Sequence, residues 1–342
     1  MNWKDESVIV FGGSGFLGKY IVERLIGLNC KNIISYSRRG DDELAAKGVD
    51  VFTGDIRNRE GVMEAVRNCS VVIHTAAKAG IWGPRKLYYD VNVKGTQNVL
   101  DACRKHDVRT LVYTSSPSAT YSPLEDVENA DEYLEYPKKY LAFYPETKAR
   151  AEREVLSYDW SDLSAVILRP HLIWGPRDPH LLPQIIARAK AGKLKIIGHG
   201  DNFVDLTYVV NAAEAHIKGA EFARKSGRNF RKAYFISDDS PVNLWGWVNN
   251  MLTELNIDPV SAKIPFKTAY NAGKMMEMIY KFMPWSYQPP MTRFVAGQLA
   301  FSHFFNIKAA KKDFGYDPVV DLETAFVNTV EWLQSQELCG GK

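Results

Sequence analysis

The sequence predicts an α/β fold, in which a doubly wound parallel sheet is joined to a smaller, mostly helical lobe. Three observations favour this fold class. Short apolar runs alternate with helical patterns through the first half of the chain. A glycine-rich turn directly follows the first of these runs. Beyond Arg169 prolines mark loops, and from about residue 242 aromatic residues and methionines become frequent.

The expected sheet is built from short apolar runs, as in a sheet that is buried on both faces. These strands are Ser7–Phe11, Ile33–Tyr36, Asp50–Thr53, Val71–His74, Thr110–Thr114, Ala165–Leu168 and Ala233–Ile236. The helices between them carry apolar residues at helical spacing. The expected long helices are Phe16–Leu28, Leu87–Lys105, Phe143–Tyr158 and Val209–Ala223.

The composition is that of an ordinary globular protein without a nucleic-acid partner. Apolar residues make up 46% of the 342 residues, and the formal net charge is only +3. The 4 cysteines are scattered and form no CxxC pair, so neither a metal site nor a disulfide framework is expected. The charged start and the lack of a long apolar stretch predict a cytoplasmic chain without a signal peptide or a transmembrane segment.

The glycine-rich turn lies between the first strand and the first helix, and this context makes it a dinucleotide-binding fingerprint of the Rossmann type. Gly12 permits the tight turn, Gly15 lets the backbone approach the pyrophosphate, and Gly18 allows close packing of helix on sheet. The helix N-terminus offers N–H groups to the phosphates. The expected cofactor-binding residues of this turn are Gly12, Gly13, Ser14, Gly15, Phe16, Leu17 and Gly18.

The end of the second strand favours NADP(H) over NAD(H). An NAD site usually carries an acidic residue about 20 positions beyond the glycines. Here Ser37 occupies that place, and Arg38 and Arg39 follow it. Arginines attract and bind a 2′-phosphate, which a carboxylate would repel. If the two arginines are merely solvated surface charges, NAD(H) remains the alternative.

Tyr144 and Lys148 form the second motif. Residues four apart share one face of a helix, so both side chains can point into one cleft. Pro145 places Tyr144 at the first turn of that helix. A nearby ammonium is expected to lower the pKa of the tyrosine from its usual value near 10. Tyr144 would then act as general acid in carbonyl reduction and as general base in the reverse direction.

In this order the motifs resemble those of the extended short-chain dehydrogenases/reductases, specifically the 3β-hydroxysteroid dehydrogenase type. The resemblance covers nearly the whole chain. The segments that carry it are Gly12–Gly18, Gly54–Ile56, His74–Ala77, Val91–Val99, Tyr113–Ser116, Tyr144–Lys148 and Leu168–Pro170.

The resemblance implies a third catalytic residue, Ser116, whose hydroxyl would polarise the substrate carbonyl; the adjacent Ser115 is the alternative. It implies a supporting role for Asn92, which otherwise is an ordinary helix residue. A homodimer that pairs Leu87–Lys105 with Phe143–Tyr158 is also implied. The further cofactor contacts that it implies are Asp55, Ile56, Ala76, Ala77, Lys78, Tyr144, Lys148, Pro170 and His171.

These expectations divide the chain into two parts and a tail. Residues 1–170 would form the dinucleotide-binding domain, rejoined by about 205–240. Residues of about 171–204 and 241–320 would form the substrate lobe. Residues 321–342 would form a C-terminal helix and tail.

Several stretches further resemble the bacterial 2-alkyl-3-oxoalkanoate reductases within this family, among them Ala76–Gly83, Leu168–Pro176 and Lys311–Tyr316. This resemblance implies NADPH-dependent reduction of a long-chain 2-alkyl-3-oxo acid to the 3-hydroxy acid. The loop residues Lys78, Arg85 and Arg177 are candidates for binding the carboxylate. The apolar stripe from Met275 to Trp285 would be a substrate wall, part of the core, or a helix resting on a membrane surface.

Three alternatives stay open. An NAD-dependent 3β-hydroxysteroid or sterol dehydrogenase would oxidise an alcohol, and the lack of an acid at Ser37 counts against it. An epimerase or dehydratase of nucleotide sugars would recycle its bound NAD, and no diphosphate clamp is evident. A non-enzymatic NADP-binding sensor or scaffold would have no need of Ser116, Tyr144 and Lys148.

Overall fold

The centre of the protein is a parallel sheet, seen in a computed structural model that describes residues 1–340, with side chains through residue 336. Its seven strands lie in the order β12-β7-β5-β4-β1-β2-β3, and every neighbouring pair is parallel. This confirms the doubly wound sheet. The strands are β1 (Ser7–Phe11), β2 (Asn32–Ser37), β3 (Asp50–Thr53), β4 (Val71–His74), β5 (Thr110–Thr114), β7 (Ser164–Pro170) and β12 (Arg231–Ile236).

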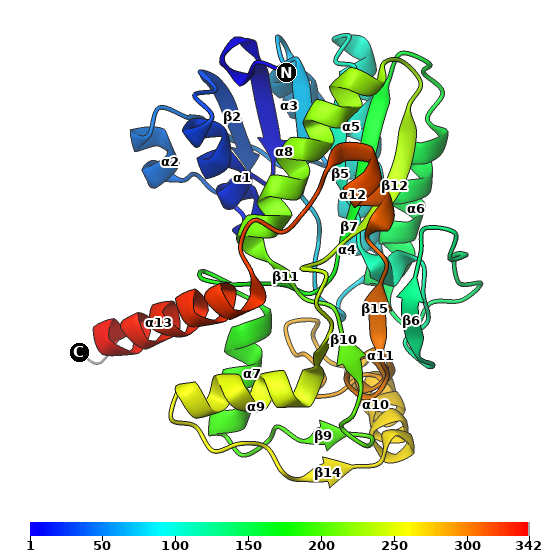
Figure 1. Cartoon of the computed structure of the whole chain (residues 1–342). Helices are drawn as coiled ribbons and strands as arrows, with labels where there is room; N and C mark the ends of the chain where they lie inside the picture. Colours follow the sequence, from blue (N-terminus) through cyan, green and yellow to red (C-terminus); the bar gives the residue numbers. More distant parts are fainter. Residues whose placement is uncertain (341–342) are drawn as a thin grey trace.

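Helices cover both faces of the sheet (Figure 1). In β1, Val8 and Val10 face one hydrophobic cluster, whereas Ile9 and Phe11 face another, as the alternation of strand side chains requires. The first cluster includes α1 (Phe16–Gly27), α8 (Val209–Ser226) and α12 (Lys308–Phe314). The second includes α3 (Arg59–Val66), α5 (Gly95–Lys105) and α6 (Phe143–Ser157).

The predicted helix Leu87–Lys105 is one helical run of three parts: α4 (Arg85–Tyr89), a π-helical turn η2 (Asp90–Lys94) and α5. A π turn inserts one extra residue and often marks a functional site. The sequence did not predict α3 or α2 (Asp42–Ala46), because both are short and strongly charged. Two short 3-10 helices also belong to this part of the fold: η1 (Trp3–Asp5), before β1, and η3 (Pro117–Ala119), after β5.

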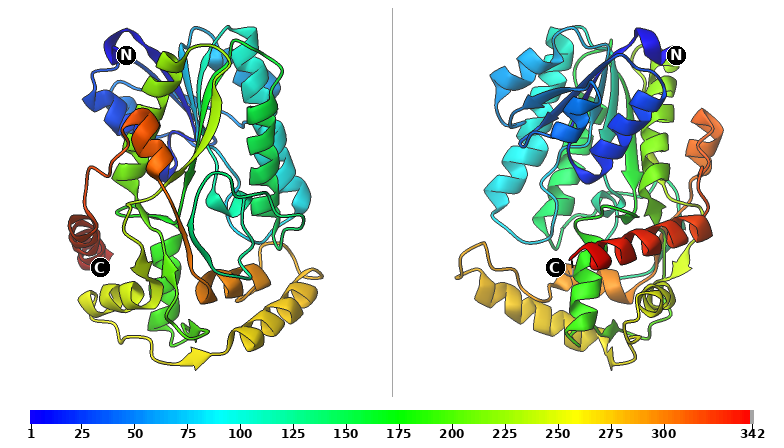
Figure 2. Two further views of the ribbon diagram at one scale, coloured as in Figure 1. Left: turned by 45° about the vertical axis from the view of Figure 1, so that its right-hand side comes forward. Right: turned by 90° about the vertical axis from the view of Figure 1, so that its left-hand side faces the viewer.

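The second part of the fold is a lobe at the carboxyl ends of the central strands (Figure 2). Its own core gathers Trp174, Trp245 and Trp247 with aliphatic residues of several elements. Its helices are α7 (Leu181–Lys190), α9 (Leu244–Glu254), α10 (Phe266–Tyr280) and α11 (Arg293–Ala300), and α13 (Leu322–Gly340) follows α12. The sequence did not predict α7, whose Pro183 lies in the first turn, where proline is tolerated.

Short strands complete the lobe and join it to the sheet. A four-stranded sheet has the order β13-β10-β15-β6, and β11-β8 and β14-β9 form two-stranded pairs. These strands are β6 (Val127–Ala130), β8 (Ile173–Trp174), β9 (Ile196–Ile197), β10 (Phe203–Val204), β11 (Thr207–Tyr208), β13 (Val242–Asn243), β14 (Lys263–Ile264) and β15 (His303–Phe305). Within the described residues, no helix combines the length and the apolar character needed to cross a membrane. The last two residues of the predicted tail, 341–342, lie outside the described part of the chain.

Candidate active site

The turn after β1 has the geometry of a phosphate cradle. Gly12 has φ of +87°, and its N–H donates to the Tyr36 carbonyl at 2.8 Å. A Cβ at Gly18 would come 2.0 Å from the Gly12 carbonyl oxygen, and one at Gly13 would come 2.3 Å from Ser35 Oγ. Side chains at these positions would therefore displace the backbone of the turn.

Helix α1 begins at Phe16, and its N-cap Gly15 makes no side-chain hydrogen bond. The first N–H groups of a helix have no partner inside the helix, so they are free to bind an anion. The turn and the helix start thus fit the pyrophosphate of a dinucleotide, as the sequence predicts.

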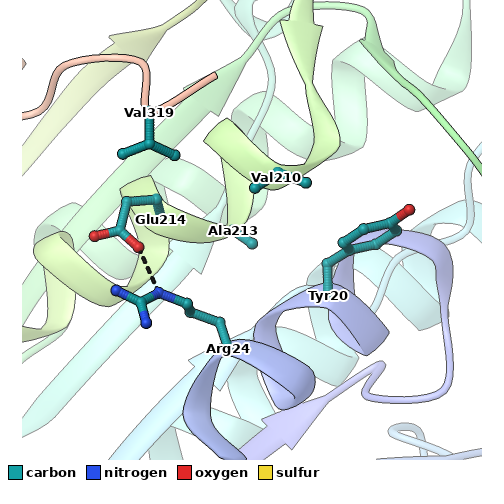
Figure 3. A pocket seen from close by; sticks show the side chains of 6 residues that line it. All are labelled: Tyr20, Arg24, Val210, Ala213, Glu214 and Val319. Carbon is teal, nitrogen blue, oxygen red and sulfur yellow. Dashed lines mark hydrogen bonds and ion pairs between the residues drawn. The ribbon is translucent and has the colours of Figure 1, made fainter. Parts of the chain in front are cut away.

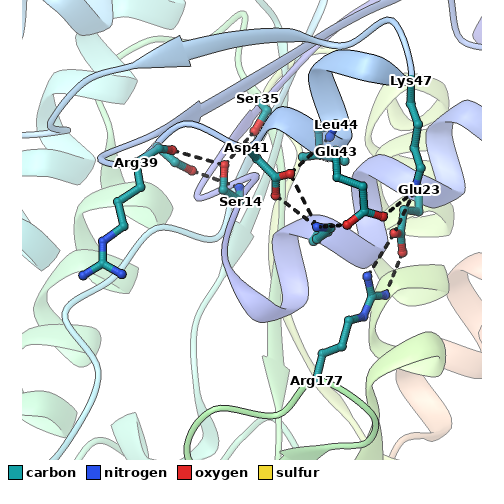
Figure 4. Close-up of polar contacts among 11 residues, drawn as sticks. Ser14, Glu23, Ser35, Arg39, Asp41, Glu43, Leu44, Lys47 and Arg177 are labelled. Atoms are coloured by element: carbon teal, nitrogen blue, oxygen red, sulfur yellow. Dashed lines mark hydrogen bonds and ion pairs between the residues drawn. The ribbon is translucent and has the colours of Figure 1, made fainter. Parts of the chain in front are cut away.

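Two cations, Arg38 and Arg39, follow the end of β2, and Figure 4 shows Arg39. The Ser37 hydroxyl accepts a hydrogen bond from the Ser14 N–H at 3.0 Å, which ties the end of β2 to the glycine turn. Arg38 and Arg39 are exposed, and neither guanidinium has a hydrogen-bond or ion-pair partner within the described residues. The nearby Asp41 instead caps α2 through the Leu44 N–H and pairs with Lys19 at 3.2 Å.

The predicted adenine contacts, Asp55 and Ile56, differ in accessibility. The Asp55 carboxylate accepts two hydrogen bonds from the Arg57 guanidinium, at 2.9 and 2.7 Å, and one from the Arg57 N–H at 2.9 Å, and these interactions lower its pKa. Arg38 adds to the lowering, so its charge acts close to Asp55. The Ile56 side chain is buried in the core beside Gly95. Contact of Asp55 and Ile56 with the adenine ring stays a prediction.

Asn92 holds the segment after β4 in place. Its Oδ1 accepts from the Lys78 N–H at 2.7 Å, and its Nδ2 donates to the Lys78 carbonyl at 3.3 Å and to Thr147 Oγ1 at 3.0 Å. Asn92 is buried and lies within the π turn η2. It therefore fixes the Ala76–Lys78 backbone against α6, next to Lys148, and is more than an ordinary helix residue.

Tyr144 and Lys148 lie on the first turns of α6. The Lys148 ammonium donates to Tyr113 Oη at 2.9 Å and to the Thr114 carbonyl, and burial lowers its pKa to about 7. Burial raises the pKa of Tyr144, and a hydrogen bond with Ser116 opposes this. The predicted lowering of this pKa by Lys148 is therefore wrong in direction, because burial outweighs the favourable contacts and the ammonium is bound to Tyr113 and Thr114.

The structure favours Ser116 over Ser115 as the site serine. Ser115 Oγ is buried without a partner, and the Ser115 N–H donates to the Leu168 carbonyl. Ser116 Oγ instead contacts Ser118 Oγ at 2.9 Å and is the hydroxyl that bonds Tyr144. Ser116 also caps η3 through the Ser118 N–H at 3.3 Å. Sequence reasoning missed the role of Tyr113, although this residue stands inside the Tyr113–Ser116 motif.

Pro170 ends β7, and His171 follows it into the interior. His171 Nε2 and His303 Nδ1 lie 2.6 Å apart, and His303 Nε2 contacts the Gln298 carbonyl at 2.9 Å. Burial lowers the pKa of both histidines, that of His303 to about 4. His171 is therefore a neutral, hydrogen-bonded residue. Nothing in the sequence indicated its partner His303, 132 positions away.

Of the three cations considered for a substrate carboxylate, two are already paired. Arg177 binds Glu23 with two hydrogen bonds, at 3.0 and 2.7 Å, and Arg85 pairs with Glu146 at 2.8 Å. Lys78 Nζ donates to the Ala79 carbonyl and lies 5.2 Å from the centre of the Tyr88 ring. Burial and the charge of Arg38 lower its pKa.

A hollow between α1 and α8 lies on the other face of the sheet from α6 (Figure 3). Its lining includes the ion pair of Arg24 with Glu214, at 2.7 Å, and the Tyr20 ring. None of the predicted site residues lines it, and Figure 3 shows no free polar group aimed into it beyond that pair.

The fold and the glycine cradle are those of an extended short-chain dehydrogenase/reductase, and the family model and the named relatives make the chain an NAD(P)-dependent oxidoreductase. The chain belongs to the 3-beta hydroxysteroid dehydrogenase/isomerase family, whose model matches residues 9–266. It is 42% identical to 2-alkyl-3-oxoalkanoate reductase of Shewanella oneidensis, covering 94% of this chain and 84% of the relative. The reductase of the same name from Stenotrophomonas maltophilia is 40% identical, with 92% and 96% covered.

Eukaryotic sterol enzymes are more distant relatives. The mouse sterol-4-alpha-carboxylate 3-dehydrogenase (decarboxylating) is 33% identical, over 96% of this chain and 91% of the relative. Among solved structures, MoeE5 with UDP-glucose and NAD gives a TM-score of 0.75 at 23% identity, over 97% and 99% of the two chains. At that identity the likeness concerns the fold alone. The expected homodimer through α5 and α6 stays a prediction.

Proposed function

We propose that the protein reduces a long-chain 2-alkyl-3-oxo acid to the 3-hydroxy acid with NADPH. The convergence of Ser116, Tyr144 and Lys148 at the carboxyl ends of β5 and β7, beside the glycine cradle, carries this proposal. The names of the two bacterial reductases, which match nearly the whole chain, support this substrate class.

The cluster divides the work of carbonyl reduction. A reduced nicotinamide cofactor held by the glycine cradle would supply the hydride that reduces the carbonyl carbon. Ser116 and Tyr144 donate hydrogen bonds to the carbonyl oxygen and stabilise the negative charge that develops there. Tyr144 then gives its phenolic proton to that oxygen, which completes the hydroxyl group. Because burial raises the pKa of Tyr144, the phenol is protonated at neutral pH and ready to donate.

Lys148 positions this machinery. Its two hydrogen bonds to Tyr113 and Thr114 tie α6 to the end of β5. Its buried ammonium thereby fixes the start of α6, which carries Tyr144 as the proton donor. By resemblance to the family, Lys148 would also hold the nicotinamide ribose.

Two groups of cations supply the specificity. Arg38 and Arg39 bind the 2′-phosphate of NADPH, because neither guanidinium forms a hydrogen bond or ion pair with a described residue and Asp41 is engaged by the Leu44 N–H and Lys19. Lys78 binds the substrate carboxylate, because Arg85 and Arg177 are occupied by Glu146 and Glu23. Lys78 lies over the Tyr88 ring. A negative charge on Tyr144 would raise the pKa of Tyr88, which connects this ring with the proposed proton donor.

An NAD-dependent 3β-hydroxysteroid or sterol dehydrogenase is the second candidate function. The sterol relatives at 33% identity favour it. This second candidate would use NAD instead of NADPH. Because NAD has no 2′-phosphate, Arg38 and Arg39 would have no role in binding it.

The variant Tyr144→Phe tests the proposed site. It should lower kcat by about a hundredfold to ten-thousandfold, because the proton donor is lost. The dissociation constant of NADPH, measured by fluorescence titration, should stay unchanged. Tyr133→Phe, at a 92% exposed tyrosine on a distant loop, is the matched control and should keep full turnover. Full turnover by Tyr144→Phe would remove this residue from the chemistry.

A further inference from the structure

The outer face of α10 and the segment behind it carry an unusual concentration of exposed apolar side chains. The structure describes thirteen exposed large apolar residues, and six of them fall between residues 275 and 287. Phe282 is 92% exposed. We call this set the α10 face: Met275, Met278, Ile279, Phe282, Trp285 and Tyr287.

The other side of α10 is packed against the lobe. Ala269, Gly273 and Glu277 are buried there. A Cβ at Gly273 would come 2.7 Å from the Thr292 backbone, so α10 and the start of α11 are in close contact. Glu277 pairs with Arg293 at 2.7 Å. In both views of Figure 2, α10 (gold) lies at the outer edge of the lobe, so its outer face is left to an external partner.

Charge on this face has one sign. Lys267, Lys274 and Lys281 are exposed and recur every seven residues, which places them in one row along the helix. Glu277 is the single acidic residue between 266 and 287, and it is buried under Arg293. The outer surface of α10 is thus a row of cations beside a row of apolar side chains.

We propose that the α10 face binds the surface of a lipid bilayer that contains anionic headgroups. A helix of this kind lies in the interface, with its apolar side chains among the acyl chains and its lysines at the headgroups. Trp285 and Tyr287 are of the residue types that prefer the depth of the headgroups. A second copy of the chain fits less well, because a twofold contact would set one row of lysines against the other.

The proposed lipid surface adjoins the active-site side of the lobe. The Trp285 and Trp82 rings lie 5.6 Å apart, and Trp82 belongs to the segment that follows β4 and carries Lys78. For a long-chain substrate, bilayer binding would bring the cleft to the lipid. That consequence rests on the proposed function, whereas the binding itself does not.

Co-sedimentation of the full chain with phosphatidylcholine vesicles, with and without phosphatidylglycerol, tests the proposal. The protein should bind the anionic vesicles, with an affinity that falls as salt is raised, and should bind neutral vesicles more weakly. Lys274→Glu/Lys281→Glu should weaken binding on the order of tenfold or more, since each basic residue contributes roughly 1 kcal/mol. The charge-matched control Lys31→Glu/Lys225→Glu, at exposed lysines of other elements, should bind much more like the parent protein.

A second pair of variants tests the apolar part. Phe282→Ser should weaken vesicle binding several-fold, and Tyr133→Ser, at an equally exposed aromatic residue, should leave it unchanged. Unchanged oxidoreductase turnover without vesicles would show that these variants are folded. Equal binding by all variants, or no binding of the parent protein to anionic vesicles, would overturn the proposal. So would self-association in light scattering that Phe282→Ser abolishes, because the face would then pair two copies.

Discussion

At the scale of single residues, the proposed preference for NADP(H) depends on Arg38 and Arg39. They follow Ser37, which stands where an acidic residue would grip the ribose of NAD, and no acidic side chain in the described part of the chain forms an ion pair with them. Asp41 is the nearest acid in sequence, but α2 and Lys19 engage it. A phosphate at the adenosine ribose would thus meet two free guanidinium groups.

We predict that Arg38→Ala/Arg39→Ala lowers kcat/KM for NADPH by about tenfold to a hundredfold, because charged hydrogen bonds contribute about 1.5–3 kcal/mol. The kcat/KM for NADH should stay the same. Initial rates with each cofactor measure this, with Arg67→Ala/Arg228→Ala at two exposed arginines as the control. An equal fall in kcat/KM with both cofactors would contradict the prediction, because the arginines would then support the structure of the site without recognising the 2′-phosphate.

At the scale of elements, the turn between β1 and α1 depends on close backbone contact. The Gly18 position leaves no room for a Cβ beside the Gly12 carbonyl, whereas nothing lies within 4 Å of a Cβ at Gly27, at the other end of the same helix. The two glycines of α1 therefore serve different purposes. The first shapes the cofactor site, and the second only lowers helix stability.

Gly18→Ala should weaken NADPH binding by about fivefold to a hundredfold, because an ordinary core clash costs about 1–3 kcal/mol. Gly27→Ala should leave binding intact and raise the free energy of unfolding by about 0.5–1 kcal/mol. Fluorescence titration and chemical denaturation measure the two quantities. Unweakened NADPH binding by Gly18→Ala would contradict the assigned cradle.

The strands and helices differ in how well the sequence alone could predict their bounds. The strands β1, β3, β4 and β5 have the predicted bounds, because each is a short buried run with a clear end. The helices α2 and α3 were missed, since their few apolar residues are set among charges. The π turn η2 was missed because the sequence pattern of a π turn differs little from that of an α-helix.

The same distinction holds for the site. Motifs near one another in sequence, such as Tyr144 and Lys148, could be joined by helical spacing alone. The contacts of Lys148 with Tyr113 and of Asn92 with Thr147 span 35 and 55 positions, and they depend on how the strands and helices pack. The pKa of Tyr144 was predicted in the wrong direction, because its burial cannot be obtained from the spacing.

At the scale of the whole molecule, buried carboxyl groups join the sheet to the lobe. Asp205 accepts from the Phe305 N–H at 2.7 Å, and Asp238 accepts from the Tyr208 N–H at 2.8 Å. Burial raises the pKa of Asp205 to about 7 and that of Asp238 to about 6. The charges of Asp238 and Asp239 raise the pKa of Asp205 further.

The raised pKa of Asp205 implies a pH-dependent stability. Between an unfolded pKa near 3.9 and the folded value of about 7, the folded state binds more protons, so stability falls as the pH rises through this window. Asp205→Asn should remove this loss of stability, because an amide does not ionise. Its Tm should be close to that of the parent protein near pH 3 and higher near pH 8, by an amount corresponding to about 1–4 kcal/mol.

Thermal unfolding at several pH values, with the exposed Asp42→Asn as control, checks this prediction. A Tm difference that is the same at every pH would mean that the Asp205 carboxyl does not titrate in this window. Ionisation of Asp205 would then make no contribution to the pH dependence of the stability.

The central claim is NADPH-dependent turnover of a 2-alkyl-3-oxo acid, and one assay tests it most directly. The absorbance of the reduced nicotinamide is followed with NADP⁺ or NAD⁺, using the 2-alkyl-3-hydroxy acid or a 3β-hydroxysteroid, because the keto acid readily loses its carboxylate. The account predicts turnover of the hydroxy acid with NADP⁺, and loss of that turnover in Tyr144→Phe. Turnover of the steroid with NAD⁺, and none of the acid with either cofactor, would contradict it.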